Sequence, residues 1–208
     1  MKCKIEHLNE IRRTAALVLA VLLFSAIALA AKLRLEQRAL ASQLIRLHVV
    51  ANSDDPGDQA RKLKVRDAVL PVIARLTANC SNAEQAQAAL HSGLPEIRAA
   101  AESALSCEGC ADPISARLQS ETFPQRDYPT FSLPAGEYTA LRVTIGAGAG
   151  HNWWCVAFPA LCLPAGVEDF EDTARTAGFS RRQVELMTEH TAPIRVKFRL
   201  LEWIAGLL

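Results

Sequence analysis

An uncharged apolar stretch from Thr14 to Ala31 limits what this chain can be more than any other feature of its sequence. Four basic residues precede it, namely Lys2, Lys4, Arg12 and Arg13. Such a basic flank stays in the cytoplasm while the apolar part enters the membrane. We therefore expect everything from Lys32 onward to lie outside the cytoplasm.

The same stretch fits two fates, cleavage as a signal peptide or retention as a membrane anchor. Its densest apolar part, Ala15 to Phe24, has the length of a signal-peptide core, and small residues suited to cleavage follow at Ala26, Ala28 and Ala30. The whole run is also long enough for one spanning helix, which needs roughly 17–25 residues. Both fates stay open at this point, and a buried core helix is a third alternative.

The composition indicates one ordinary domain after this segment. The chain has 208 residues, half of them hydrophobic, and a formal net charge of +1. Mixed charges of this kind lack the basic footprint that nucleic-acid binding requires, so we exclude nucleic acid as a partner. We also expect no metal site, no cofactor and no small-molecule substrate.

Three regions follow from the pattern of residues: a signal peptide or anchor over residues 1–31, a helical spacer over 32–43 and an exported domain over 44–208. The domain opens with a buried strand that begins at Leu44. A helix from Pro56 to about Ala78 follows, with Asp55 as its expected cap. We expect a kink or an end of its regular part at Pro71, because proline lacks an N–H group.

Strands dominate the second half of the domain, after two alanine-rich helical stretches. They are expected at Ser115 to Phe123, Glu137 to Ile145, Trp153 to Phe158 and Ile194 to Leu200, with a polar, helix-permissive segment from Val167 to His190. The order of elements predicts an α+β fold with a mixed or mainly antiparallel sheet and two or three helices, preceded by the signal or anchor helix.

Five of the six cysteines lie beyond the apolar run, in a compartment that permits disulfides: Cys80, Cys107, Cys110, Cys155 and Cys162. Five is an odd number, so at least one of these thiols is unpaired within the chain or pairs with a partner. A structural disulfide between Cys155 and Cys162 is our leading hypothesis, and free buried thiols are the alternative. Cys110 is a candidate partner for Cys80.

A catalytic interpretation is also open, with Cys155 as a nucleophile and His151 as its base. Asn152 could orient His151, but closeness in sequence does not supply the required geometry. The glycines Gly146, Gly148 and Gly150 resemble a phosphate-binding loop, yet a tryptophan-rich strand follows them instead of a helix N-terminus. We favour a turn that presents the tryptophans.

Trp153 and Trp154 are adjacent, so in a strand they point to opposite faces and at most one enters the core easily. The other is a candidate anchor for a partner, unless a neighbouring helix or loop covers it. His48, within the first strand, is expected to be a core histidine with a satisfied hydrogen bond. Arg66 falls on the apolar face of its helix and should pair with acidic residues of the turn over residues 52–58.

Three blocks of sequence resemble a known family. They are Leu47 to Asp54 with Asp58-Gln59 and Leu63 to Val69; Leu133 to Tyr138 with Ala140 to Val143; and Ile145 to Gly150 with Asn152 to Val156 and Phe158 to Cys162. In this order, and behind an export segment, they resemble the stage II sporulation protein R family. The loop from Cys107 to Cys110 and the segment from Val167 to His190 are not part of that resemblance.

The resemblance implies a protein that is made in the forespore and exported into the space between the two membranes of the engulfing septum. There it would activate a membrane-embedded aspartic peptidase of the mother cell, which then processes the sigma-E precursor. We expect a signalling ligand and not an enzyme. The alternatives are a cell-envelope hydrolase that uses Cys155 and His151, and a purely structural envelope component.

The residues expected to matter for this function fall into two groups. Partner-binding candidates lie in the loops at the strand ends, and structural residues lie beside them. The partner-binding candidates are Asn52, Asp54, Gly150, Asn152, Trp153 and Trp154, and the structural residues are Arg66, Cys155 and Cys162.

Overall fold

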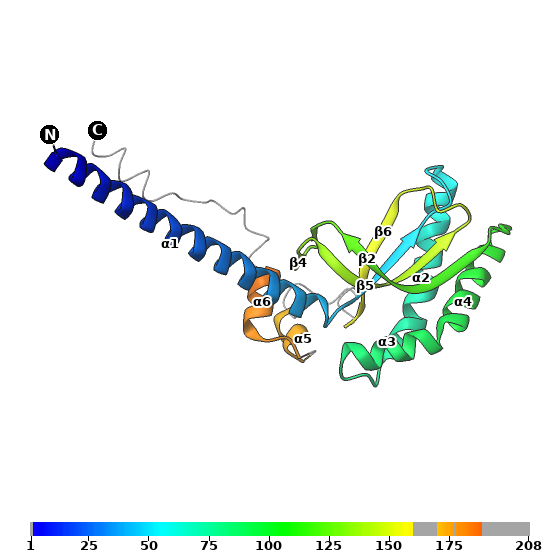
Figure 1. Cartoon of the computed structure of the whole chain (residues 1–208). Helices are drawn as coiled ribbons and strands as arrows, with labels where there is room; N and C mark the ends of the chain where they lie inside the picture. Colours follow the sequence, from blue (N-terminus) through cyan, green and yellow to red (C-terminus); the bar gives the residue numbers. More distant parts are fainter. Residues whose placement is uncertain (1, 160–169, 177, 189–208) are drawn as a thin grey trace. The chain divides into compact units, whose positions relative to one another are not determined.

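The computed structural model describes residues 2–159, 170–176 and 178–188, and it divides into two compact units, Met1–Leu40 and Ala41–Leu208. Helix α1, Lys2–Ala41, makes up the first unit (Figure 1). Its part Arg12–Ala41 is long and apolar enough to cross a membrane by length and composition. A signal sequence meets the same criterion, so both predicted fates stay open. The predicted N-terminal apolar helix is confirmed, and it continues as helix through most of the expected spacer.

A four-stranded mixed sheet forms the centre of the second unit, with the order β2-β5-β1-β6 (Figure 1). Its strands are β1 Ile45–Val50, β2 Ile114–Phe123, β5 Gly136–Ile145 and β6 Asn152–Phe158. β1 runs parallel to β5 and antiparallel to β6, whereas β2 runs antiparallel to β5. The predicted α+β class and mixed sheet are confirmed.

Smaller elements complete the described part of this unit. A two-stranded sheet joins β3, Arg126–Asp127, to β4, Ser132–Leu133. Two short helices, α5 Phe170–Thr176 and α6 Arg181–Thr188, lie in the segment expected to permit helix. The strand predicted from Ile194 to Leu200 lies outside the described residues.

Three helices pack on one face of the sheet: α2 Pro56–Thr77, α3 Ala83–Ser92 and α4 Leu94–Ser106 (Figure 1). Asp55 caps α2 as predicted, since its side chain accepts a hydrogen bond of 2.8 Å from the N–H of Gly57. Pro71 does not end the helix, which continues to Thr77. The predicted extent of α2 is therefore confirmed, and an end of the helix at Pro71 is wrong.

The alternation of side chains along β1 gives the sheet two different faces. Ile45, Leu47 and Val49 enter the core beneath the helices, where they are 0–1% exposed. Arg46 and His48 therefore point to the opposite face, because successive side chains in a strand alternate. Residues of β2 and β5 continue this second face, which we call the polar face: Arg46, His48, Ser115, Arg117, Gln119, Glu121, Arg142 and Thr144.

Candidate functional site

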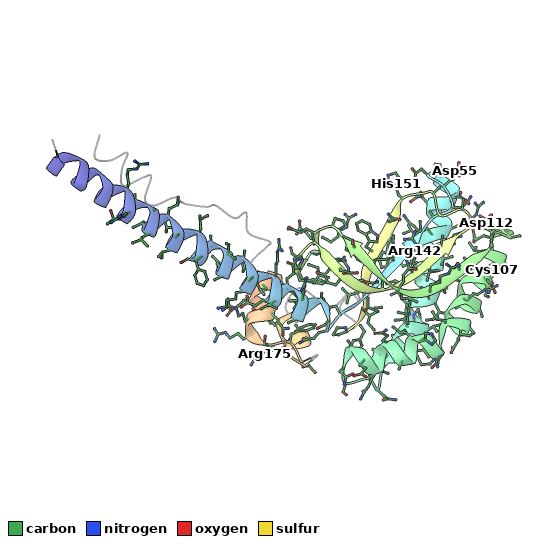
Figure 2. All side chains as sticks on the ribbon, in the orientation of Figure 1. Asp55, Cys107, Asp112, Arg142, His151 and Arg175 are labelled. Atoms are coloured by element: carbon green, nitrogen blue, oxygen red, sulfur yellow. The ribbon has the colours of Figure 1, made fainter. Side chains whose placement is uncertain are left out.

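Two loops meet at one edge of the sheet because β1 and β5 are parallel neighbours whose carboxyl ends lie together. Residues 51–58 follow β1, and residues 146–152 follow β5 and lead into β6. We call these two segments the paired loops. Figure 2 shows Asp55 and His151 at this same end of the domain. The predicted partner-binding candidates from Asn52 to Trp154 lie in or next to the paired loops.

Backbone hydrogen bonds join the paired loops directly. The N–H groups of Ala149 and Gly150 donate to the carbonyls of Asn52 and Ala51, each over 3.0 Å. The side-chain oxygen of Asn52 also accepts from the N–H of Ala147 over 2.9 Å. Asn52 is thus a structural pin between the loops and not a freely presented side chain.

The glycines of the second loop are explained by this close approach. Gly146 and Gly148 adopt positive φ angles of 55° and 63°, which side chains rarely allow. A Cβ atom on Gly150 would lie 2.1 Å from the carbonyl oxygen of Ser53. These glycines shape a turn that leads into a strand, as the sequence predicts, and the phosphate-binding interpretation has no helix N-terminus to support it.

Asp58 ties the first loop to the start of α2. Its side chain accepts hydrogen bonds from Ser53 over 2.6 Å and from Asn52 over 3.0 Å, and it pairs with Arg61 at 2.5 Å. The bonds from Ser53 and Asn52, with a smaller contribution from Arg61, hold the pKa of Asp58 below its ordinary value of 3.8. The loop is therefore fixed by a charged carboxylate at neutral pH.

Asp54 and His151 join the loops at their exposed tips. One Asp54 carboxylate oxygen accepts from the His151 N–H over 2.6 Å and also pairs with the His151 ring nitrogen Nδ1. These bonds lower the pKa of Asp54. Both side chains remain accessible, at 57% for Asp54 and 79% for His151. The site therefore presents an acid–imidazole pair on an ordered frame.

Lys62 of α2 holds the backbone of His151 in place. Its ammonium group donates to the backbone carbonyl of His151 over 3.1 Å and to the side chain of Gln59 over 2.6 Å. Lys62 is 6% exposed, and this burial lowers its pKa. The sequence analysis missed Lys62, because nothing in its helical position indicates a contact with a carbonyl 89 residues away.

The two tryptophans contact opposite sides of the sheet and both are partly covered. Trp153 packs against the core, and its ring lies 5.1 Å from the guanidinium carbon of Arg66. Trp154 lies edge-on to His48 and Phe123, and the Arg126 guanidinium carbon sits 4.0 Å from its ring centroid. This arrangement favours the alternative in which neighbouring residues cover them. Asn152, just before them, is exposed.

The partner predicted for Arg66 is wrong. Arg66 pairs with its neighbour Asp67 at 2.7 Å and contacts Trp153, instead of reaching the turn over residues 52–58. Arg61 lies one helical turn after Asp58 and therefore neutralises that carboxylate first. His48 meets its expectation, because it is 6% exposed and its Nδ1 lies 2.7 Å from Glu121.

The catalytic pair considered from the sequence is not assembled. Cys155 is disulfide-bonded and 1% exposed, and the ring of His151 pairs with Asp54 instead. Its predicted partner, Cys162, lies outside the described residues. The predicted link between Cys80 and Cys110 is wrong, since both are free thiols.

Metal binding has no support in the part of the chain that the structure describes. No three histidine, cysteine, aspartate or glutamate side chains there are placed to hold a metal ion. The polar face holds the other charged cluster that the sequence analysis missed, around Arg117, Glu121 and Arg142. The alternation of polar and apolar residues along the strand of Arg142 was the one sequence signal for this face. The contacts themselves depend on strand order, which the alternation does not give.

Comparison with known proteins places this architecture in a family. Residues 41–167 match the family described as stage II sporulation protein R, a range that contains the sheet and the paired loops. The stage II sporulation protein R of Bacillus subtilis (strain 168) is 35% identical over 185 residues, which cover 81% of this chain and 83% of that relative. No solved structure matches the chain. The chain belongs to the stage II sporulation protein R family.

Proposed function

We propose that this protein is an exported signal of the sporulation programme that activates a membrane-embedded aspartic peptidase of the mother cell. Activation triggers processing of the sigma-E precursor, and the protein itself acts as a ligand and not as a catalyst. Export across the forespore membrane brings the domain into the space between the two membranes. Family membership and the apolar segment Arg12–Ala41 support this proposal.

The observation that supports a specific contact surface is the exposed acid–imidazole pair on the paired loops. Its frame is held by hydrogen bonds from both loops, so Asp54 and His151 are ordered before any partner arrives. A pre-ordered surface loses little conformational entropy on binding. Asn152 extends the same exposed surface. We therefore place the peptidase contact at Asp54, His151 and Asn152.

Reconstitution tests both the function and the surface. The full chain is co-expressed with the sporulation peptidase and the sigma-factor precursor, and precursor cleavage is followed. Cleavage should depend on this chain, and the double variant His151→Ala/Asn152→Ala should reduce it. Arg98→Ala is the matched control, because Arg98 is an exposed cation on α4 whose side chain forms an ion pair only with Glu102 among the described residues.

The outcomes separate the surface from the function. Loss of cleavage in the double variant, with an unchanged thermal unfolding midpoint and normal export, supports a contact at the paired loops. Full cleavage in that variant overturns the contact surface and leaves the signalling role intact. Absence of cleavage with a folded, exported wild-type chain overturns the signalling role itself.

A further inference from the structure

The polar face carries a row of basic side chains that adjacent strands place side by side. Arg117 of β2 lies directly opposite Arg142 of β5, and Arg142 lies opposite His48 of β1. Like charges directly opposite each other on one face destabilise a sheet. The Arg117–Arg142 pair therefore works against folding unless an anion lies between the two guanidinium groups.

The carboxylate of the polar face, Glu121, already has three hydrogen-bonding partners. Glu121 accepts from Arg142 over 2.9 Å, from Gln119 over 2.7 Å, and its other oxygen lies 2.7 Å from His48 Nδ1. The Arg117 side chain makes no hydrogen bond or ion pair with any described residue. Glu121 therefore neutralises Arg142, and the positive charge of Arg117 has no counter-ion among the described residues.

Hydrogen-bond donors are also in excess across this face. Three buried donor nitrogens lack an acceptor within the described ranges, namely Arg46 Nε, Arg46 Nη1 and Trp154 Nε1, and His48 Nε2 has no hydrogen-bond partner there either. Arg46 is fully buried and His48 is 6% exposed. Buried donors normally find partners, so this surplus is uncommon and indicates a face that is short of acceptors.

A cavity of about 350 Å³ lies over this row. The side chains around it come from β2 and β5 and all offer donors: Ser115, Arg117, Gln119, Arg142 and Thr144. Arg142 is held in place by Glu121 and by Thr144, whose hydroxyl accepts from Arg142 Nε over 3.2 Å. The cavity is therefore lined by ordered donors and one free guanidinium group.

We propose that this cavity is a binding site for a carboxylate group, which the guanidinium groups of Arg117 and Arg142 hold. Guanidinium groups bind carboxylates through paired N–H···O bonds, and a single carboxylate would balance the charge of Arg117. The hydroxyls of Ser115 and Thr144, which also line the cavity, add further donors. Free small carboxylates and an acidic side chain of a peptide share this chemistry. The site is separate from the proposed contact at the paired loops and does not rest on the proposed function.

Nuclear magnetic resonance of the full chain in a non-ionic detergent tests the site through the Nε–H signals of its arginines. The probes are a blocked glutamate that carries one carboxylate, a blocked pentapeptide with one central glutamate, and inorganic phosphate. The glutamine counterparts of the first two probes are the neutral controls. The glutamate probes should shift the Arg117 and Arg142 signals in a saturable way, whereas the glutamine probes should not.

The variant Arg117→Gln should weaken carboxylate binding by at least about tenfold, since one charged hydrogen-bonding partner is lost. Arg98→Gln, on the exposed surface of α4, is the matched control and should leave binding unchanged. Arg117→Gln should also leave the unfolding free energy unchanged or raise it, because it removes the like charge opposite Arg142. A purely structural role for Arg117 predicts a loss of stability instead.

Tighter binding of the pentapeptide than of the blocked glutamate identifies a peptide as the source, and equal binding identifies a free carboxylate; both support the site. No saturable shift, equal shifts with the glutamine controls, or tighter binding of phosphate than of either carboxylate would overturn it. Destabilisation by Arg117→Gln without a change in binding would do the same.

Discussion

One carboxylate oxygen of Asp54 accepts a hydrogen bond of 2.6 Å from the backbone N–H of His151, although the two residues lie 97 positions apart. The parallel pairing of β1 with β5 explains the contact, because it brings the loops that follow both strands to the same edge. Two further bonds reinforce the contact: the Asn52 side-chain oxygen accepts from the N–H of Ala147, and the N–H of Gly150 donates to the Ala51 carbonyl. The proposed contact surface is therefore held in one conformation only when β1 and β5 pair in this register.

Replacement of Gly150 by alanine should separate the paired loops. The new Cβ would lie 2.1 Å from the Ser53 carbonyl oxygen, which is backbone and cannot rotate away. We expect a loss of about 2 kcal/mol in the free energy of unfolding, as for other overpacked sites. Urea unfolding of the full chain in detergent, followed by tryptophan fluorescence, measures the change.

Gly57→Ala is the control for this variant. A Cβ at Gly57 would meet only the ends of the Asp55 and Arg61 side chains, and the residue lies in the first turn of α2. Its stability should stay close to that of the wild type. Equal stability of both variants would show that the loops can part without cost.

Arg46 should be stabilising through its packing more than through its charge. It is fully buried, its guanidinium carbon lies 4.1 Å from the Phe123 ring centroid and 5.1 Å from that of Tyr138, and it donates to the Tyr128 hydroxyl over 2.8 Å. Arg46→Ala should cost about 3 kcal/mol because it leaves a cavity. Arg46→Met should cost clearly less, since a hydrophobic side chain fills the space without an unpaired charge. Chemical unfolding of both variants checks this order, and a larger loss for methionine would contradict it.

Alkylation should report the state of the cysteines. Cys107 is an exposed free thiol, whereas Cys155 is buried and disulfide-bonded. Iodoacetamide under native, non-reducing conditions should therefore label Cys107 first and leave Cys155 unlabelled until reduction and unfolding. Peptide mass mapping locates the label. Rapid labelling of Cys155 in the native chain would instead revive the hydrolase alternative.

The fold was predictable where local sequence decides it. The buried first strand and the cap at Asp55 are local, and the structure has both. The phase of α2 placed Arg66 near the core but could not identify its partners, which are Asp67 and the ring of Trp153. A helical phase fixes direction, whereas a partner also depends on which elements lie opposite.

The candidate site was predictable only in outline. The loops were located from polar and glycine-rich sequence, but their pairing requires the parallel β1–β5 contact between distant segments. The row of basic side chains on the polar face was missed because its strands are also distant in sequence. Arg117 and Arg142 lie opposite each other only in the observed strand order. Register between distant strands is set by the whole sheet and not by either strand alone.

The last prediction concerns acid and Glu121. Burial acts to raise the pKa of Glu121, but the hydrogen bonds from Arg142, His48 and Gln119 outweigh it, and the pKa lies below its ordinary value of 4.5. A carboxyl group whose pKa is lowered in the folded state adds stability above its unfolded pKa. That stability is lost as the pH falls from 4.5 through the folded pKa. Glu121→Gln should therefore be less stable than the wild type at neutral pH, and the gap should narrow in acid.

Thermal unfolding of the wild type and Glu121→Gln, between about pH 7 and pH 3, measures this gap. Glu84→Gln is the control, because Glu84 lies in the first turn of α3 and its carboxylate has no hydrogen bond within the described part of the chain. This control distinguishes the effect of losing the contacts of Glu121 with Arg142 and His48 from the general effect of removing one negative charge. A gap for Glu121→Gln that stays constant across the range would mean that the ionised carboxylate does not hold the polar face together. In that case the cations of this face would need an anion from outside the chain even more strongly.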